Sequence, residues 1–268
     1  MIDINLDPNM IVLGPLLITW HGFFSAVGLG IGMWLTARLV RGTAMTADDV
    51  YTIALAAVPG GIIGARLLYA AENAHLFVNN PLGVLAINEG GISIYGAVIG
   101  GTIAGAIYAR LSKRPLGLLA DRAMIGLLLG QGIGRIGDIV NGEHHGQPAG
   151  DFPFSVRYTH PQTLGEFGQT VHLAVGYELI YDFVMTGFLI WFLRRQPRDG
   201  MTFVLYQIIY GFGRLWVGFF RKDTLVFANL GMAQTIGLLA VVVCVPWLIL
   251  MWRGSRQISR AERRRARA

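Results

Sequence analysis

Apolar residues occur in long runs along this chain, and polar stretches separate the runs. Because a helix rises about 1.5 Å per residue, roughly 20 apolar residues span the hydrocarbon core of a bilayer. The longest polar stretch, 141–171, predicts an irregular or short-stranded insertion. The apolar runs predict seven membrane-spanning helices, at about 11–39, 50–71, 92–109, 116–140, 175–193, 201–220 and 230–252.

Composition favours an integral membrane protein. Hydrophobic residues make up 53% of the 268 residues and charged residues only 14%, against about 25% charged in soluble domains. We expect an all-α transmembrane domain at 1–252 and an Arg-rich tail at 253–268. Because no basic region precedes the first apolar run, we expect that run to be retained rather than cleaved as a signal peptide.

Basic residues alternate between the two sides of this predicted domain. The loops after the first, third and fifth helices with their flanking residues, together with the tail, hold sixteen Lys and Arg, against three in the N-terminus and the remaining loops. The positive-inside rule therefore places the tail in the cytoplasm, and the N-terminus and the insertion outside. Seven arginines in the last sixteen residues indicate contact with anionic membrane lipid rather than nucleic acid. One cysteine, Cys244, and no metal-ligand spacing predict neither disulfide, metal nor cofactor.

The stretch Gly134–Gly146 reads GRIGDIVNGEHHG and directly follows an apolar run. It places Arg135 at membrane depth, where a guanidinium is costly unless it meets a partner or an anionic ligand. The surrounding glycines leave room for a close approach to the backbone. The stretch predicts a site for an anionic lipid headgroup. The alternative is that Arg135 and Asp138, three residues apart, only neutralise each other.

Two further arginines, Arg66 and Arg214, lie within predicted helices. Arginines that converge on a phosphodiester bind it through paired hydrogen bonds and stabilise charge on a phosphate leaving group. The alternative is that they pair with Glu178 or Asp182 and only link helices.

These residues resemble a known family. The 134–146 stretch is similar to the prolipoprotein diacylglyceryl transferase signature, usually G-R-x-G-N-F-x-N-x-E-x-x-G. Tyr177-Glu178 resembles the family's Y-E, and Tyr210-Gly-Phe-Gly-Arg214 with Phe219-Phe-Arg221 resembles its Y-G-x-x-R…F-F-R. GGIIGARLLY and GGISIYGAVIGG are similar to its second and third helices. The resemblance covers nearly the whole chain and implies seven helices with an outward N-terminus.

The resemblance implies transfer of the diacylglyceryl group of phosphatidylglycerol to the lipobox cysteine of a preprolipoprotein signal peptide. Glycerol phosphate is released, and the setting is the bacterial cytoplasmic (inner) membrane. Because the nucleophile is the substrate's thiol, no catalytic Cys or Ser is needed. The implied catalytic residues are Arg135, Arg214, Glu143 and Tyr95. The implied substrate-binding residues are Asn141, Asp138, Gly146, Arg66, Tyr210, Arg221 and His172.

Several polar motif positions depart from the family pattern. Tyr95 stands where the pattern S-F-H-G-G has histidine, Asp138 where the signature has asparagine, and Gly218 where a glutamate is usual. A phenol with a pKa near 10 is a poor base at neutral pH. Two interpretations follow: an enzyme with a rearranged base (Glu143, His144 or His172), or a paralogue of altered or no activity that binds anionic phospholipid or lipoprotein precursors.

Overall fold

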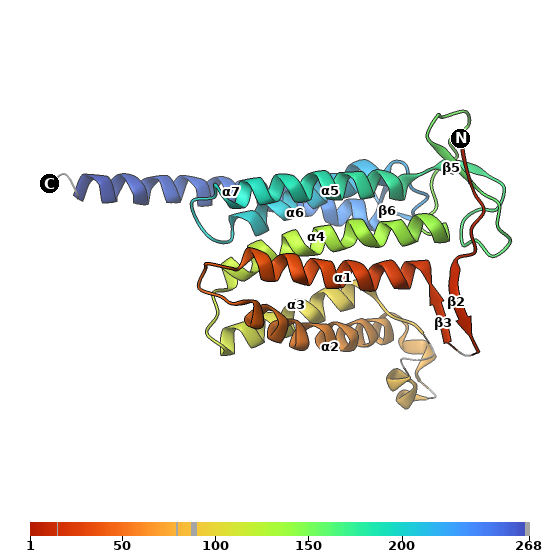
Figure 1. Cartoon of the computed structure of the whole chain (residues 1–268), viewed down its shortest axis with the longest axis horizontal. Helices are drawn as coiled ribbons and strands as arrows, with labels where there is room; N and C mark the ends of the chain where they lie inside the picture. Colours follow the sequence, from red (N-terminus) through yellow and green to blue (C-terminus); the bar gives the residue numbers. More distant parts are fainter. Residues whose placement is uncertain (15, 79, 87–89, 266–268) are drawn as a thin grey trace. The chain divides into compact units, whose positions relative to one another are not determined.

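Helices make up most of the computed structural model (Figure 1), which describes residues 1–14, 16–78, 80–86 and 90–265. Seven short strands accompany them within these residues, so the fold is mostly rather than wholly helical. The α-helices are α1 (Trp20–Leu39), α2 (Ala47–Glu72), α3 (Ile94–Leu111), α4 (Leu116–Asn141), α5 (Ala174–Leu193), α6 (Met201–Gly218) and α7 (Met232–Arg265), with 3-10 turns η1 (Ala74–Leu76) and η2 (Pro81–Leu85).

Six of the described helices, all except α6, are long and apolar enough to cross a membrane. Many of their apolar side chains stay exposed, among them Leu55, Val98 and Ile180. Such continuous apolar surface is unfavourable in water and favourable in lipid. The chain is therefore a multi-pass membrane protein. Helix α6 is 18 residues long and carries Gln207 and Arg214 within its length, which lowers its hydropathy.

The chain divides into two compact units, residues 36–119 and the remainder. In the first, α2 and α3 lie side by side (Figure 1). A methyl group on Gly64 would lie 2.8 Å from the Cα of Gly100, and one on Gly96 would overlap the backbone of Gly64. Glycines at these positions let the two helix backbones pack directly, as is common in membranes. Thr46 begins α2 with a capping box formed with Asp49.

The second unit uses the same device at two helix pairs. A methyl group on Gly130 of α4 would lie 2.7 Å from the carbonyl oxygen of Gly28 in α1, and one on Gly237 of α7 would lie 2.6 Å from that of Gly211 in α6. These contacts need glycine because any Cβ would collide with backbone that cannot move aside. They hold α1 against α4, and α6 against α7, at backbone distance.

The polar insertion folds with the N-terminus of the chain. Strand β1 (Ile2–Ile4) pairs in parallel with β4 (Ser155–Tyr158), and β4 pairs antiparallel with β5 (Thr170–His172). Val156, Tyr158 and Val171 form a small buried cluster in this sheet. This part of the chain therefore contributes two short strands.

One predicted boundary is wrong. The first apolar run does not form one helix from residue 11, because β2 (Asn9–Leu13) and β3 (Leu16–Thr19) form an antiparallel hairpin before α1. Short apolar runs fit strands and helices equally, and Gly14, with φ of +57°, turns the chain. Helix α7 continues to Arg265, through most of the predicted tail; residues 266–268 of that tail lie outside the described residues.

Candidate functional site

The α4 residues Arg135 and Asp138 form the ion pair that their spacing predicts. Nη1 of Arg135 donates to Oδ2 of Asp138 at 2.6 Å, and only 2% of the Asp138 side chain is exposed. The pair neutralises part of the charge on Arg135. This ion pair involves only Nη1 of the guanidinium. The other terminal nitrogen of Arg135, Nη2, lies 2.7 Å from Oε2 of Glu178 in α5.

Three arginines lie around the carboxylate of Glu178. Its Oε1 accepts a hydrogen bond from Nη1 of Arg214 in α6 and lies 3.3 Å from Nη1 of Arg221, just after α6. Its Oε2 faces Arg135, although the N–H of Arg135 is not aligned for a hydrogen bond. The carboxylate is 6% exposed. Arg135 and Arg214 therefore lie within reach of one small anion, which is what the phosphate hypothesis requires.

Within the described residues, the guanidinium of Arg214 uses only part of its hydrogen-bonding capacity. Among the described residues, none accepts a hydrogen bond from its Nε or Nη2, and 15% of its side chain is exposed. These two nitrogens form the edge of a guanidinium that matches two phosphate oxygens. The three nitrogens of Arg221, in contrast, face Glu178, Asp223 and His144. Arg214 is thus the arginine best equipped to bind a further anion.

The loop after α4 holds Asn141 and Glu143 together. Nδ2 of Asn141 donates to Oε1 of Glu143 at 2.9 Å, and the backbone amide of Glu143 donates to the Asp138 carbonyl at 3.0 Å. Gly142 turns the chain with φ of +78°, a conformation that favours glycine. The Tyr158 hydroxyl donates to the carbonyl of Ile139. Burial raises the pKa of Tyr158, so the hydroxyl keeps its proton for this bond.

Backbone pairing connects this loop to Arg221. Gly146 and Arg221 form an isolated antiparallel bridge, and the backbone amide of Lys222 donates to the carbonyl of His145 at 2.9 Å. A methyl group on Gly146 would overlap the backbone of His172, so glycine is required there. The Nδ1 of His172 lies 3.2 Å from the Tyr177 hydroxyl. His172 therefore packs beside the loop, with its ring against aromatic neighbours.

His144 adopts a left-handed backbone, with φ of +59°, and its Nδ1 faces Nη2 of Arg221 at 3.3 Å. Burial, Arg221 and Arg135 together lower the pKa of His144 to about 4. Its imidazole is neutral at physiological pH and accepts hydrogen bonds, but it holds an added proton poorly.

Two α6 residues complete the surroundings of the arginines. The Tyr210 ring stacks on Tyr206, with centroids 5.6 Å apart, and its hydroxyl is close enough to interact electrostatically with Arg135, Arg214 and Glu178. At Gly218, where the family pattern has glutamate, a methyl group would lie 2.6 Å from Nε2 of Gln234. The Gln234 side chain fills this space and donates to the Leu215 carbonyl.

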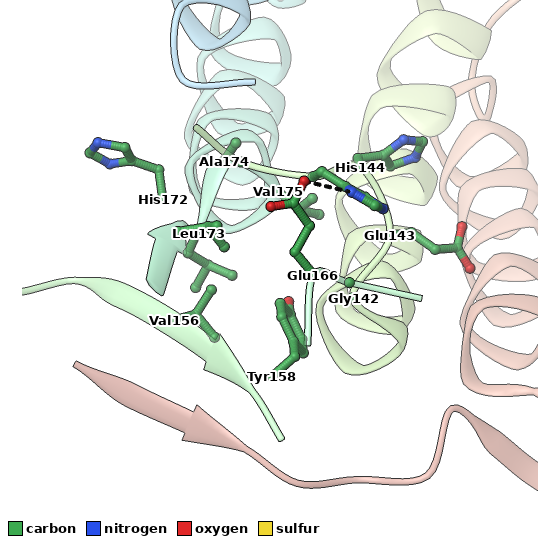
Figure 2. A pocket seen from close by; sticks show the side chains of 14 residues that line it. Gly142, Glu143, His144, Val156, Tyr158, Glu166, His172, Leu173, Ala174 and Val175 are labelled. Carbon is green, nitrogen blue, oxygen red and sulfur yellow. Dashed lines mark ion pairs between the residues drawn. The ribbon is translucent and has the colours of Figure 1, made fainter. Parts of the chain in front are cut away.

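A pocket lies beside the loop that follows α4 (Figure 2). It is lined by the loop after α4, by β4 and β5 and by the start of α5, and Arg135, Arg214 and Glu178 are not among its lining residues. In Figure 2 the Tyr158 and Glu166 side chains border it, whereas Glu143 points away toward α1. The guanidinium groups that an anionic headgroup would need therefore lie outside the lining of this pocket.

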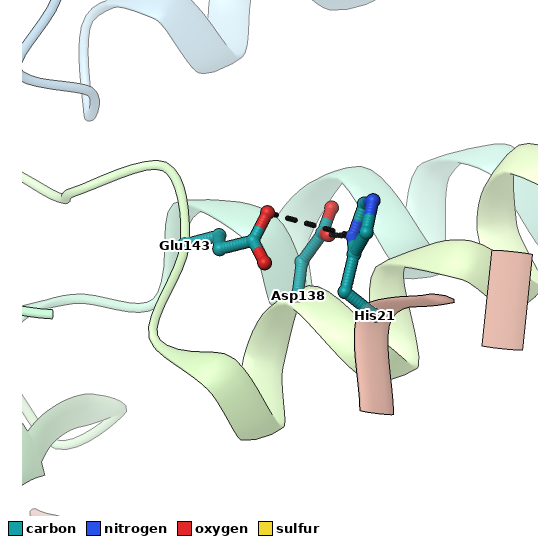
Figure 3. Close-up of side chains that lie close together, drawn as sticks. All are labelled: His21, Asp138 and Glu143. Carbon is teal, nitrogen blue, oxygen red and sulfur yellow. Dashed lines mark hydrogen bonds and ion pairs between the residues drawn. The ribbon is translucent and has the colours of Figure 1, made fainter. Parts of the chain in front are cut away.

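Sequence reasoning missed His21. Its Nδ1 is hydrogen-bonded to Oδ1 of Asp138 and lies 3.5 Å from Oε2 of Glu143 (Figure 3). The three residues offer ligand atoms within 4.8 Å of one another, which suits either a shared proton or a metal ion. The only signal in the sequence was Asp138 itself, an acid in a signature that usually has asparagine.

The other two predicted residues, Arg66 and Tyr95, lie in the unit of residues 36–119. Arg66 is 6% exposed, and its three guanidinium nitrogens donate to backbone carbonyls of Gly83, Val84, Gly90 and Gly91 at 2.5–2.8 Å. Tyr95 is the second residue of α3, with 37% exposure. The roles assigned to both residues from the sequence stay predictions.

The fold and this cluster define a multi-pass membrane protein with arginines gathered around one carboxylate. Residues 8–252 match the family described as prolipoprotein diacylglyceryl transferase. A phosphatidylglycerol–prolipoprotein diacylglyceryl transferase from Dehalococcoides mccartyi is 36% identical over 258 residues, covering 96% of this chain and 98% of the relative. Proteins of the same name from Symbiobacterium thermophilum and Synechococcus elongatus are 34% and 31% identical, covering 92% and 94% of this chain and 92% and 89% of the relatives. This chain belongs to the prolipoprotein diacylglyceryl transferase family.

Proposed function

We propose that this protein transfers the diacylglyceryl group of phosphatidylglycerol to the lipobox cysteine of preprolipoprotein signal peptides and releases glycerol phosphate. Family membership and the names of its relatives support this activity. The bond that breaks joins the diacylglyceryl carbon to a phosphate oxygen, so negative charge grows on the phosphate. Guanidiniums fixed in place before the reaction stabilise that charge.

One observation carries the proposal: Arg135 and Arg214, from different helices, share the carboxylate of Glu178. A headgroup phosphate that approaches the free edge of Arg214 would meet Arg135 across the same small space. Glu178 then acts as the internal anion that holds both guanidiniums ready, at the geometry that charge-assisted hydrogen bonds need.

The remaining site residues take supporting roles in this proposal. Asn141 and Glu143 order the loop beside the headgroup, and Gly146 keeps that loop against His172. Arg221 adds charge at the edge of the cluster, and Tyr210 borders the space between the two gripping arginines.

Residues in the other unit complete the assignment. Arg66, whose nitrogens all donate to carbonyls, clamps the connection between α2 and α3. Tyr95 orients substrate through its hydroxyl. Asp138, which the resemblance assigned to substrate binding, acts here by neutralising Arg135 and holding His21.

The same proposal includes the topology. We infer seven spans in the bacterial inner membrane, with α6 as the seventh because it packs on α5 and α7, an outward N-terminus and insertion, and a cytoplasmic tail that contacts anionic lipid. The domain covers 1–252 and the tail 253–268. The charge asymmetry between alternate loops supports the orientation. Cysteines introduced at Gln147 and Ser259 should then be labelled from opposite faces of the membrane, and labelling from one face would contradict it.

The activity is tested with the purified protein in phosphatidylglycerol vesicles and a synthetic lipobox peptide. We expect lipidated peptide and glycerol phosphate to appear in equal amounts. A peptide with alanine in place of the lipobox cysteine is the matched control. Binding of phosphatidylglycerol or peptide without any product would overturn the transferase and favour the non-catalytic paralogue.

A further inference from the structure

His21, Asp138 and Arg135 form a continuous polar chain. Asp138 accepts from His21 through Oδ1 and from Nη1 of Arg135 through Oδ2, and it is almost fully buried, with 2% of its side chain exposed. Glu143 faces the same ring nitrogen of His21 from the loop after α4 (Figure 3). A buried carboxylate therefore joins an imidazole to one of the two arginines that grip the phosphate.

A single glycine, Gly137, lets His21 lie next to Asp138. A methyl group on Gly137 would lie 2.6 Å from both the Cα of His21 and the carbonyl oxygen of Trp20. Only glycine lets the first turn of α1 rest on the backbone of α4 at this level. The residue that follows Gly137 is Asp138, whose carboxylate then meets the His21 ring.

We propose that His21, held by Asp138, is the general base that takes the proton from the substrate cysteine. The inference rests on the proposed function. Nδ1 of His21 faces the two acids, while its Nε2 has no hydrogen-bond partner among the described residues and points away from both carboxylates in Figure 3. The side chain is 43% exposed. A carboxylate on one imidazole nitrogen fixes the tautomer, leaves the other nitrogen as acceptor and stabilises the imidazolium that forms.

Two other histidines near the arginines are less suited to this task. His144 faces Arg221, and its pKa is lowered to about 4, so it takes up a proton poorly. His172 is engaged by the Tyr177 hydroxyl and packed against Phe152 and Phe220. In contrast, His21 faces two acids and has an exposed edge.

The proposed step moves one proton and replaces a carbon–oxygen bond by a carbon–sulfur bond. The thiol proton moves to Nε2 of His21, and the thiolate sulfur forms a bond to the diacylglyceryl carbon that carries the phosphate. The carbon–oxygen bond breaks, and its electron pair stays on the phosphate oxygen of glycerol phosphate beside Arg135 and Arg214. The imidazolium of His21 later releases its proton to the departing glycerol phosphate or to water. No oxidant, reductant or metal ion is needed.

Asp138 gives this arrangement a second consequence. The same carboxylate stabilises the imidazolium on one side and positions Arg135 on the other. Removing its charge should therefore affect both proton transfer and phosphate binding, whereas removing the His21 ring should affect proton transfer alone. This difference separates a base from a residue that only shapes the site.

The test compares His21→Gln and Asp138→Asn with the wild type in the vesicle assay, over pH 6 to 9. His75→Gln, on an exposed histidine in the other unit, is the matched control. We expect His21→Gln to lower kcat by about 100-fold at pH 7, because general bases contribute roughly 10²–10⁴, with the KM for phosphatidylglycerol nearly unchanged. We expect Asp138→Asn to lower kcat and also to raise that KM. His75→Gln should match the wild type.

The pH profile is the decisive readout. Besides Arg135 of α4, the groups that face His21 are Asp138 and Glu143. A cysteine thiol has a pKa of about 8.5, so hydroxide supplies thiolate as the pH rises and the defect of His21→Gln should shrink toward pH 9. Added imidazole should partly restore His21→Ala. These signatures do not arise from misfolding.

Several outcomes would overturn the base assignment. A His21→Gln rate within about threefold of the wild type would do so, as would a defect that is constant from pH 6 to 9 and is not rescued by imidazole. Loss of wild-type activity on chelation, with recovery on adding zinc, would make the cluster a metal site instead. A wild type that makes no lipidated peptide would defeat the proposed function itself, which is a separate failure.

Discussion

Two arginines of this protein are held by the surrounding protein in opposite ways. Arg66 donates from Nε, Nη1 and Nη2 to backbone carbonyls between residues 83 and 91, so its charge is surrounded by neutral acceptors and every nitrogen is used. Arg214 is held by the acid Glu178 through one nitrogen, and no described residue binds its other two. The first arrangement fixes a connection, and the second leaves a guanidinium edge for a ligand.

The position of an arginine within a predicted span does not by itself show whether that arginine can bind a ligand. An ionisable residue in a predicted span is a functional candidate by default, and both arginines satisfy that rule equally. They differ in how many donors remain once the protein's own acceptors are counted. Four changes test this distinction, from the largest expected effect to the smallest.

Glu178→Gln removes the acid that Arg135, Arg214 and Arg221 share. Breaking a buried ion pair leaves uncompensated charge and costs about 3–5 kcal/mol, so we expect the free energy of unfolding in detergent to fall by about that amount. Thermal or denaturant unfolding monitored by tryptophan fluorescence measures it. An unchanged stability would show that the three arginines do not depend on Glu178.

Arg214→Lys keeps the charge but replaces a planar guanidinium by an ammonium. Removing one donor to a developing oxyanion costs about 10²–10³ in kcat, and we expect a fall of about 100-fold in diacylglyceryl transfer, with little change in unfolding. The vesicle assay and an unfolding curve on the same sample give both numbers. A kcat within about threefold of the wild type would contradict the role of Arg214.

Arg66→Lys should show the reverse pattern. Lysine cannot reach four carbonyls at once, and an unsatisfied buried group costs about 1–3 kcal/mol, so we expect a loss of stability of that size. The kcat per folded molecule should stay unchanged, because hydrogen bonds to backbone carbonyls already occupy all three guanidinium nitrogens of Arg66. A large loss of kcat in protein of normal stability would return Arg66 to the substrate site.

Lowering the pH should slightly reduce the stability of the folded protein through protonation of His144. Its pKa is lowered to about 4 in the folded protein, against about 6.5 when unfolded, so the unfolded chain binds more protons between these values. The contribution of His144 to the free energy of unfolding is therefore complete above about pH 6.5 and is lost as the pH drops toward 4. Because the side chain is 37% exposed, screening limits the effect to about 1 kcal/mol. His144→Gln should flatten this part of the stability curve.

Much of the fold follows from the sequence, because long apolar runs are unambiguous. The start of α5 and the end of α4 agree with prediction within one residue. The hairpin of β2 and β3 was missed because its apolar residues continue directly into α1, and nothing in their pattern separates strand from helix.

The candidate site was predictable where a motif names the residue and unpredictable where packing decides the partner. The motifs identified Arg135 and Arg214 and placed Glu178 among the possible partners. The contact of His21 with Asp138 joins residues 117 positions apart and depends on backbone packing at Gly137. The carbonyl partners of Arg66 were equally hidden, because every residue carries a carbonyl and its direction is set only by the fold.

The central claim is that Arg135 and Arg214 grip one phosphate. A double-mutant cycle of Arg135→Lys and Arg214→Lys, read out as kcat/KM for transfer from phosphatidylglycerol to the lipobox peptide, tests it most directly. Residues that act on one group are strongly non-additive, so the double variant should be within about threefold of the worse single variant. Arg66→Lys combined with Arg214→Lys is the control, and its two effects should multiply. If the effects of Arg135→Lys and Arg214→Lys also multiply, the two arginines act independently and the account is contradicted.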